Sequence, residues 1–426
     1  MLRYGPSVSI RTQFAHRPMR TALAAVLVAV AAGLAPSPAS AGQRLETIDV
    51  PSSKGYIDLA QTRLNKTTKL QANVLLPDGY DADPAKSWPV MYLLAGVGDN
   101  MSAWMDPKKG DGAKILKGFP GIVVMPESGR GYFTDWWRGG KREGSRWERY
   151  YFEEVIPQIE ARYRIKPGRQ NHAIGGLSMG GYGGLLYVGQ FPSYFGSAFS
   201  LSGLLDLQSS EVATVLPIDI GSPFSRIWGA VKGPYASTHN PVKMVANNYG
   251  SRIYVSTGDG NPSARVPFNF SAWTSGSVAE RSVRVQALRY AARARSAAVD
   301  ITYSGHSGVH DWPYWRMEFP RLLKWGVFNA PSVTDPAAHK QWSYRTMAPQ
   351  GNAWGLGYKF AAPLKSDVLF QRDGQQLKAL AADGAVGTQV TVTPGAADTD
   401  ASGNGTKPQC AVTLTLPFTH TLPAGC

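Results

Sequence analysis

Cysteine is almost missing from this chain of 426 residues, which has only Cys410 and Cys426. Both lie in the last seventeen residues, so disulfides cannot cross-link the rest of the chain. In an exported protein two such cysteines are expected to pair with each other, and a short loop of this kind contributes about 3 kcal/mol. The only histidine near either of them is His420, so cysteine catalysis is not indicated.

Long apolar runs are also missing beyond the N-terminus. The run at residues 21–35 is shorter than the roughly 20 residues that a membrane-spanning helix needs. Four arginines precede this run, and the small-x-small sequence Ala39-Ser40-Ala41 follows it, which is typical of a signal peptide with its cleavage site. We therefore expect residues 1–41 to be a signal peptide, and the mature protein to be secreted or held at the cell envelope without spanning a membrane.

Acidic residues are scarce, with 30 Asp and Glu against 44 Lys and Arg and a formal net charge of +14. Loss of the four arginines of the signal peptide leaves about +10, a charge that attracts acidic envelope polymers at long range. No zinc finger, helix-turn-helix or RNA-binding signature is present, so nucleic acid is not the expected partner. The sequence also has no nucleotide or redox cofactor motif, and no cofactor is expected.

Residues 42–335 alternate between strand-like and helical patterns. Buried strands are predicted at 70–76, 89–95, 121–125, 171–177, 252–256 and 299–303, and helices at 147–163, 179–191, 278–298 and 312–328. This alternation predicts an α/β fold with a doubly wound, mostly parallel sheet. Residues 331–350 are polar and predict a linker. Residues 351–426, with a hairpin signal at Asp373-Gly374, predict a small β-rich C-terminal module.

The strongest local motif is Gly176-Leu177-Ser178-Met179-Gly180, a G-x-S-x-G sequence between a predicted strand and a small-residue helix. This is the context of a nucleophile elbow, in which a tight strand-to-helix turn lifts the serine hydroxyl out of the sheet. The N-terminus of the following helix stabilises developing negative charge. The motif therefore predicts an α/β-hydrolase with Ser178 as its nucleophile.

A serine nucleophile needs a general base, and the base needs an acid that orients it. In this fold the order along the chain is serine, acid, histidine, and His310 follows the last predicted strand, where the base belongs. His306 is the alternative base. Glycines at 305 and 308 argue against a helical His306/His310 metal pair, and no third ligand is evident. For the acid, the residues leave open Asp259, which closely follows a strand, and Glu280, which opens a helix.

With these residues located, the chain resembles the secreted mycolyltransferases of the antigen 85 complex, within the wider family of esterases. The resemblance covers roughly residues 50–328. It is carried by short blocks in the right order: MYLLAGVGDNMSAW (91–104), VVMPESGRGYFTDWW (123–137), WERYYFEEVIPQI (147–159), AIGGLSMGG (173–181), FSLSGLLD (199–206) and GVHDWPYW (308–315).

The resemblance implies roles for individual residues. It implies that Ser178 attacks the acyl ester and that His310 is the general base. Glu280 matches the catalytic Glu of that family, whereas Asp259 matches an Asn, so the resemblance favours Glu280. The backbone N–H groups of Met179 and Val97 would form the oxyanion hole.

For substrates, the resemblance implies a lipid acyl ester as donor and a sugar or cell-wall polysaccharide as acceptor, with Trp312 lining the acceptor site. The family binds trehalose through an Asp and an Arg, but here the matching positions are Ala95 and Gly98. Three hypotheses follow. The first is an acyltransferase that forms an acyl-enzyme on Ser178, and the second is a secreted carboxylesterase with the same residues. The third is a non-catalytic envelope or matrix-binding protein.

Overall fold

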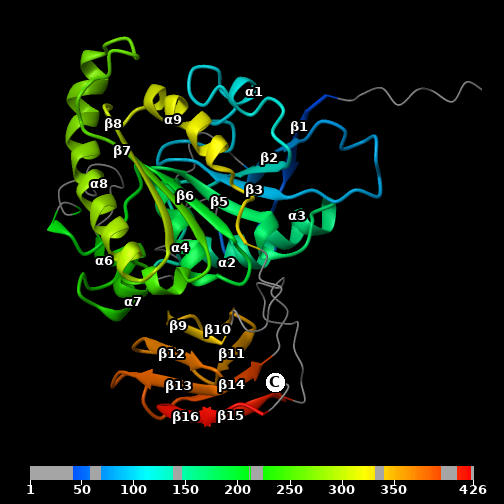
Figure 1. Cartoon of the computed structure of the whole chain (residues 1–426), viewed down its shortest axis with the longest axis vertical. Coiled ribbons are helices and arrows are strands. Elements are labelled where there is room, and N and C mark those ends of the chain that lie inside the picture. The colour runs from blue at the N-terminus through cyan, green and yellow to red at the C-terminus, as the bar shows by residue number, and fades with distance from the viewer. Residues whose placement is uncertain are drawn as a thin grey trace, which may run out of the picture. The chain divides into compact units, whose positions relative to one another are not determined.

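A computed structural model describes residues 42–57, 69–137, 146–210, 212, 224–331, 340–394 and 410–423. Its largest element is an eight-stranded sheet with the order β1-β2-β4-β3-β5-β6-β7-β8 (Figure 1). The strands are β1 (Arg44–Asp49), β2 (Gln71–Leu76), β3 (Val90–Leu94), β4 (Ile122–Pro126), β5 (His172–Leu177), β6 (Ser197–Leu201), β7 (Arg252–Gly258) and β8 (Asp300–His306).

The sheet is parallel from β4 to β8, and only β1 and β2 at one edge are antiparallel to their neighbours. The predicted α/β-hydrolase-type fold with a mostly parallel sheet is therefore confirmed. In such a sheet the carboxyl ends of neighbouring strands share one edge, and ligands bind in the crevice outside that edge. β5, β7 and β8 end there, directly before the segments that carry the candidate catalytic residues.

Helices cover both faces of the sheet. Side chains of β3 alternate between the two faces: Val90, Tyr92 and Leu94 belong to one core cluster, and Met91 and Leu93 to the other. The first cluster includes residues of α3, α4 and α8, and the second includes residues of α9. The helices are α1 (Gly112–Ile115), α2 (Trp147–Tyr150), a π-helical turn (Tyr151–Val155), α3 (Ile156–Arg162), α4 (Met179–Gln190), α6 (Phe224–Trp228), α7 (Pro234–Thr238), α8 (Phe270–Ser296) and α9 (Trp312–Trp325).

The C-terminal part is a module of antiparallel strands in two four-stranded sheets, ordered β10-β11-β14-β15 and β16-β13-β12-β9. Its strands are β9 (Gln341–Thr346), β10 (Gln350–Ala353), β11 (Leu356–Phe360), β12 (Val368–Asp373), β13 (Gln376–Ala381), β14 (Gln389–Pro394), β15 (Val412–Thr415) and β16 (Phe418–Thr421). The prediction that 331–350 is entirely a linker is wrong. β9 pairs with β12 along its full length, and Trp342 and Tyr344 are buried in the core of the module.

The module makes specific polar contacts at the C-terminal end of α4, the helix that follows Ser178. The Tyr344 hydroxyl donates to the Gln190 carbonyl at 2.6 Å. The Asn247 amide donates to the carbonyls of Gly189 and Arg345, both at 2.9 Å. Because the last carbonyls of a helix have no partner within the helix, these donors satisfy groups that would otherwise be buried without a hydrogen bond. The module is thus hydrogen-bonded to the end of α4.

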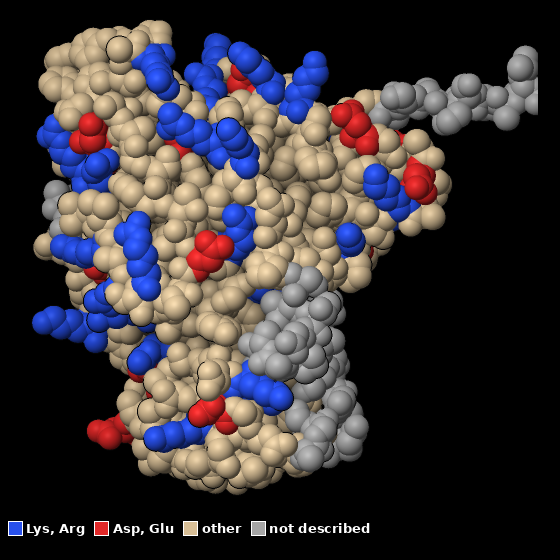
Figure 2. All heavy atoms as spheres, viewed as in Figure 1, with Lys and Arg blue, Asp and Glu red and all other residues tan. Residues whose placement is uncertain are grey.

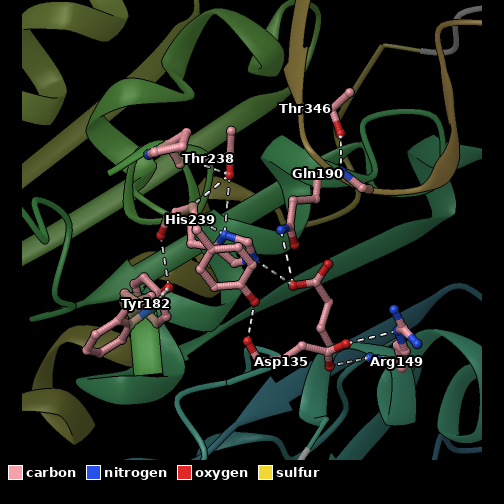
Figure 3. Close-up of polar contacts among 12 residues, drawn as sticks. Asp135, Arg149, Tyr182, Gln190, Thr238, His239 and Thr346 are labelled. Carbon is pink, nitrogen blue, oxygen red and sulfur yellow. Dashed lines mark hydrogen bonds and ion pairs between the residues drawn. The ribbon is translucent and has the colours of Figure 1, made fainter. Parts of the chain in front are cut away.

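A polar cluster lies beside α4, between α2 and α7 (Figure 3). Glu148 Oε2 lies 3.2 Å from His239 Nε2 and accepts a hydrogen bond from the Gln190 amide at 3.2 Å. Asp135 pairs with the Arg149 guanidinium at 3.0 Å. Burial, together with the nearby Glu148 carboxylate, raises the pKa of Asp135 to about 7. Asp135 is therefore expected to hold a proton in the folded protein at a pH where an exposed aspartate has lost it.

This raised pKa predicts how stability depends on pH. An unfolded aspartate has a pKa of about 3.9. Between about pH 4 and pH 7 the folded state binds a proton that the unfolded state has released, so the free energy of unfolding falls as pH rises. Asp135→Asn removes the titrating carboxyl group and with it this pH dependence. We therefore expect the Tm of the variant to rise relative to the Tm of the wild type between pH 4 and pH 7. Thermal unfolding followed by circular dichroism measures it, and a difference that is constant with pH would contradict the assignment.

Some sequence predictions lie outside the described residues, namely the signal peptide at 1–41 and Cys426. Cys410 is disulfide-bonded.

Of the helices within the described ranges, none combines the length and the apolar composition that crossing a bilayer requires.

Candidate active site

Ser178 lies in the sharp turn between β5 and α4. Its backbone has φ 51° and ψ −118°, in a region that residues other than glycine rarely adopt. Such strain is held only where the surroundings impose it, and here the Ser178 N–H donates to Leu201 O on the neighbouring strand at 2.8 Å. This conformation is the one that a nucleophile elbow requires.

The two glycines of the motif allow close packing against the end of β3. A Cβ atom on Gly176 would lie 2.1 Å from Leu94 O, and one on Gly180 would lie 2.4 Å from the same oxygen. Only glycine fits at these distances. This packing brings the first turn of α4, which begins at Met179, to the loop after β3 that contains Val97. The N–H groups predicted to form the oxyanion hole therefore come from adjoining segments.

His310 lies between Ser178 and Glu280. Its Nε2 is 2.8 Å from Ser178 Oγ, and its Nδ1 is 2.8 Å from Glu280 Oε2. With the proton on Nδ1, the ring donates to Glu280 and accepts from the Ser178 hydroxyl, which is the arrangement that activates a serine. Trp315 packs edge-to-face on the imidazole, with ring centroids 5.0 Å apart.

Glu280 is fully buried in α8, and its second carboxylate oxygen is held by two further donors. The Ser202 hydroxyl donates to Oε1 at 2.7 Å, and the Gly258 N–H donates to the same atom at 2.5 Å. Ser202 itself accepts from Trp315 Nε1 at 3.0 Å. A buried carboxylate needs such donors because burial without them disfavours the charged form. These contacts keep the carboxylate of Glu280 aimed at His310.

The alternatives weighed from the sequence take other positions. Asp259 accepts from the backbone N–H groups of Asn261 at 2.8 Å and Gly308 at 3.3 Å. Burial acts to raise its pKa, but these hydrogen bonds outweigh it and lower the pKa. Its contacts hold the loop before His310. His306 ends β8, with Nδ1 3.2 Å from Ser307 O. The structure therefore brings Glu280, and not Asp259, into contact with His310.

Trp312, expected at the acceptor site, opens α9 and is only 9% exposed. Its ring packs edge-on against Trp104 and Trp315, with centroids 5.1 and 5.6 Å away. Trp104 also donates from Nε1 to Leu94 O, at the end of β3. Trp312 thus packs on Trp315, which in turn packs on the His310 ring, and its role in an acceptor site stays a prediction.

Ser202 was not singled out from the sequence, although it lies within the SGLLD block. Ser202 has φ 53° and links Glu280 to Trp315. A second polar side chain, Gln286, accepts from the backbone N–H groups of Leu205 and Asp206 and so anchors the same segment to α8. The only sequence signal for Ser202 was the resemblance block, because its role depends on a contact with Glu280 of α8, 78 residues further along the chain.

Ser202→Ala removes a donor to Glu280 and leaves Trp315 Nε1 buried without its acceptor, a change that costs on the order of 1–3 kcal/mol of stability. We expect a loss of kcat of roughly 10-fold, because Glu280 is less firmly oriented. Ester turnover and thermal unfolding measure the two effects. The matched control is Ser256→Ala on the neighbouring strand β7, whose buried hydroxyl has no partner among the described residues. Equal losses in both variants would contradict the positioning role.

No group of three or more His, Cys, Asp or Glu side chains that could hold a metal ion occurs among the described residues. The arrangement of Ser178, His310 and Glu280 needs no metal for its chemistry, since proton transfer through an oriented imidazole activates the hydroxyl directly. It can perform nucleophilic attack on an ester carbonyl.

Comparison with known proteins agrees with this chemistry. The model of the family described as "Putative esterase" matches residues 63–325. An esterase of Mycobacterium tuberculosis is 29% identical over 202 residues, which are 44% of this chain and 42% of that protein. The diacylglycerol acyltransferase/mycolyltransferase Ag85C of Mycobacterium avium is 26% identical over 210 residues, which are 46% of this chain and 58% of that protein. The match thus spans about half the length of these curated relatives.

Solved structures show the same fold. The crystal structure of Mycobacterium tuberculosis MPT51 superposes with a TM-score of 0.52 and 20% identity, over 68% of this chain and 99% of that one. At this identity the likeness establishes the arrangement of the sheet and helices, and the chemistry must be argued from the residues of the site.

Proposed function

Because the chain belongs to the putative esterase family, we propose that it is a secreted serine acyltransferase that moves an acyl group, of mycolic type, from a lipid or trehalose ester to a sugar or cell-envelope hydroxyl. The observation that carries the proposal is that His310 is hydrogen-bonded to both Ser178 and Glu280. Its Nε2 lies 2.8 Å from Ser178 Oγ, and its Nδ1 lies 2.8 Å from Glu280 Oε2. Mycolyltransferases among the relatives support the acyl-transfer reaction.

In the first half-reaction Ser178 Oγ bonds to the acyl carbon, and the ester C–O bond of the donor breaks. The serine proton passes to His310 Nε2 and from there to the departing alcohol. In the second half-reaction the acceptor hydroxyl gives its proton to His310 and takes the acyl group, which restores Ser178. The N–H groups of Met179 and Val97 would stabilise the oxyanion in both halves.

A carboxylesterase is the second candidate, and a specific feature favours it. Ala95 and Gly98 stand where the resembling mycolyltransferases carry the Asp and Arg that bind trehalose, so those contacts to the acceptor are missing. One of the relatives is an esterase. In this candidate, water takes the acyl group in the second half-reaction.

Intact-mass analysis separates the two candidates. The protein is incubated with a trehalose mycolate or with a short-chain p-nitrophenyl ester, and Ser178→Ala is the control. A transferase gives a mass increase on Ser178 from the mycolate that disappears when trehalose or another sugar is added, with the acyl group recovered on the sugar. Acylation by the short ester alone, discharged by water and unaffected by sugars, would contradict the transferase and establish the esterase. Failure of both donors to label Ser178 would contradict both.

A further inference from the structure

The outer side of α8 carries apolar side chains that face solvent. Phe270, Val278, Val285 and Leu288 are exposed, by 67%, 58%, 39% and 45%. At 3.6 residues per turn, their spacings of eight, seven and three residues place all four within one quadrant of the helix. We call this set the α8 stripe. Exposed apolar residues aligned in this way along roughly 27 Å of helix indicate an interaction surface.

The segment that carries the stripe is rich in arginine and poor in acidic residues. Residues 262–296 contain six arginines and a single acidic residue, Glu280, which is buried. Arg281, Arg293 and Arg295 are exposed on α8, and the spacing of Arg281 places it in the same quadrant of the helix as the α8 stripe. Arg289 has an acidic neighbour, Asp206, at 3.6 Å. Figure 2 shows more Lys and Arg than Asp and Glu on this side of the molecule. The surface is therefore suited to an anionic partner.

The N-terminal end of the stripe adjoins the active site. Phe268, 63% exposed, and Phe270 lie 6.2 and 5.9 Å from Trp273, measured between ring centroids. The three rings line an open pocket of about 550 Å³, which residues from 309–316 also line. Val309 and Asp311 of this lining directly flank His310. The backbone N–H of His310 also donates to Gly276 O of α8 at 3.2 Å.

We propose that this face docks onto an anionic lipid surface, with Phe268 and Phe270 inserted among the acyl chains and the arginines of α8 against the headgroups. A helix with arginines around an apolar stripe that includes Phe and Leu has the composition of helices that lie in a membrane interface. The pocket then faces the lipid phase and receives the acyl chain of a donor ester beside His310. This last step rests on the proposed function, whereas the docking does not.

Co-sedimentation with vesicles tests the docking. The mature chain, from residue 42 and carrying Ser178→Ala, is used, so that the apolar run at 21–35 cannot bind the vesicles and no turnover alters the lipids. We expect it to sediment with phosphatidylglycerol/phosphatidylcholine vesicles, about tenfold less with pure phosphatidylcholine, and less again in 0.5 M NaCl, because salt screens the arginines. Phe268→Ser/Phe270→Ser and Arg281→Glu/Arg295→Glu are each expected to lower binding about tenfold.

The matched control is Leu380→Ser/Val386→Ser, which removes two exposed apolar side chains from the β module. It is expected to bind as the parent does. Thermal unfolding checks that every variant is folded. Absence of binding to the anionic vesicles, or equal binding by the α8 variants and the control, would overturn the proposal and leave the stripe as a contact for a protein. Binding together with failure of the mass experiment would retain the docking and reject the enzymatic function.

Discussion

Replacing Ser178 by alanine is expected to lower kcat/KM toward a p-nitrophenyl ester by roughly 10³-fold or more while the protein stays folded. The alanine lacks the hydroxyl that lies 2.8 Å from His310 Nε2, so no acyl-enzyme forms. Serine hydrolases that lose their nucleophile keep only the rate contribution of the oxyanion hole and of substrate binding. The remaining turnover therefore measures what these two features contribute here.

Steady-state kinetics and labelling by a fluorophosphonate check this prediction together. The variant should lose labelling completely and retain the Tm of the wild type within a few degrees, since alanine is isosteric apart from the hydroxyl. Substantial turnover or labelling in the variant would contradict the assignment of the nucleophile. Lack of labelling in the wild type would instead favour a non-catalytic binding protein on a hydrolase scaffold.

The second large effect is expected for Glu280→Gln, with a loss of kcat of about 10²–10⁴-fold. The amide can still accept from Ser202 and Gly258, but it no longer stabilises the imidazolium that forms when His310 takes the serine proton. If its NH₂ group faces Nδ1, it also favours the tautomer that cannot accept from Ser178. The expected loss is therefore in kcat, with little change in KM.

Asp259→Asn is the matched comparison because Asp259 was the other acid compatible with the sequence. It accepts hydrogen bonds from the loop before His310, and asparagine retains an acceptor for them. We expect a loss of less than tenfold. The reverse order, with Asp259→Asn nearly inactive and Glu280→Gln nearly normal, would contradict the role of Glu280.

Local patterns predicted most of the elements that position the site. The buried runs that became β3, β4 and β5 were found within a residue or two, because strands covered on both faces are continuously apolar. The nucleophile elbow was recognisable since its turn demands Gly176 and Gly180. The start of α8 was missed by eight residues, because its first turns, from Phe270, are exposed and have no apolar face toward the core.

The sequence by itself therefore determined the fold class and the sharp turn that holds Ser178, since both depend on patterns among residues close together in the chain. Only the tertiary structure decided which acid meets His310, because Glu280 and Asp259 both lie near the same strand end and α8 packing brings just one carboxylate to Nδ1. It also decided the roles of Ser202 and of β9. Their partners lie 78 and more than 20 residues away, and no periodicity encodes such contacts.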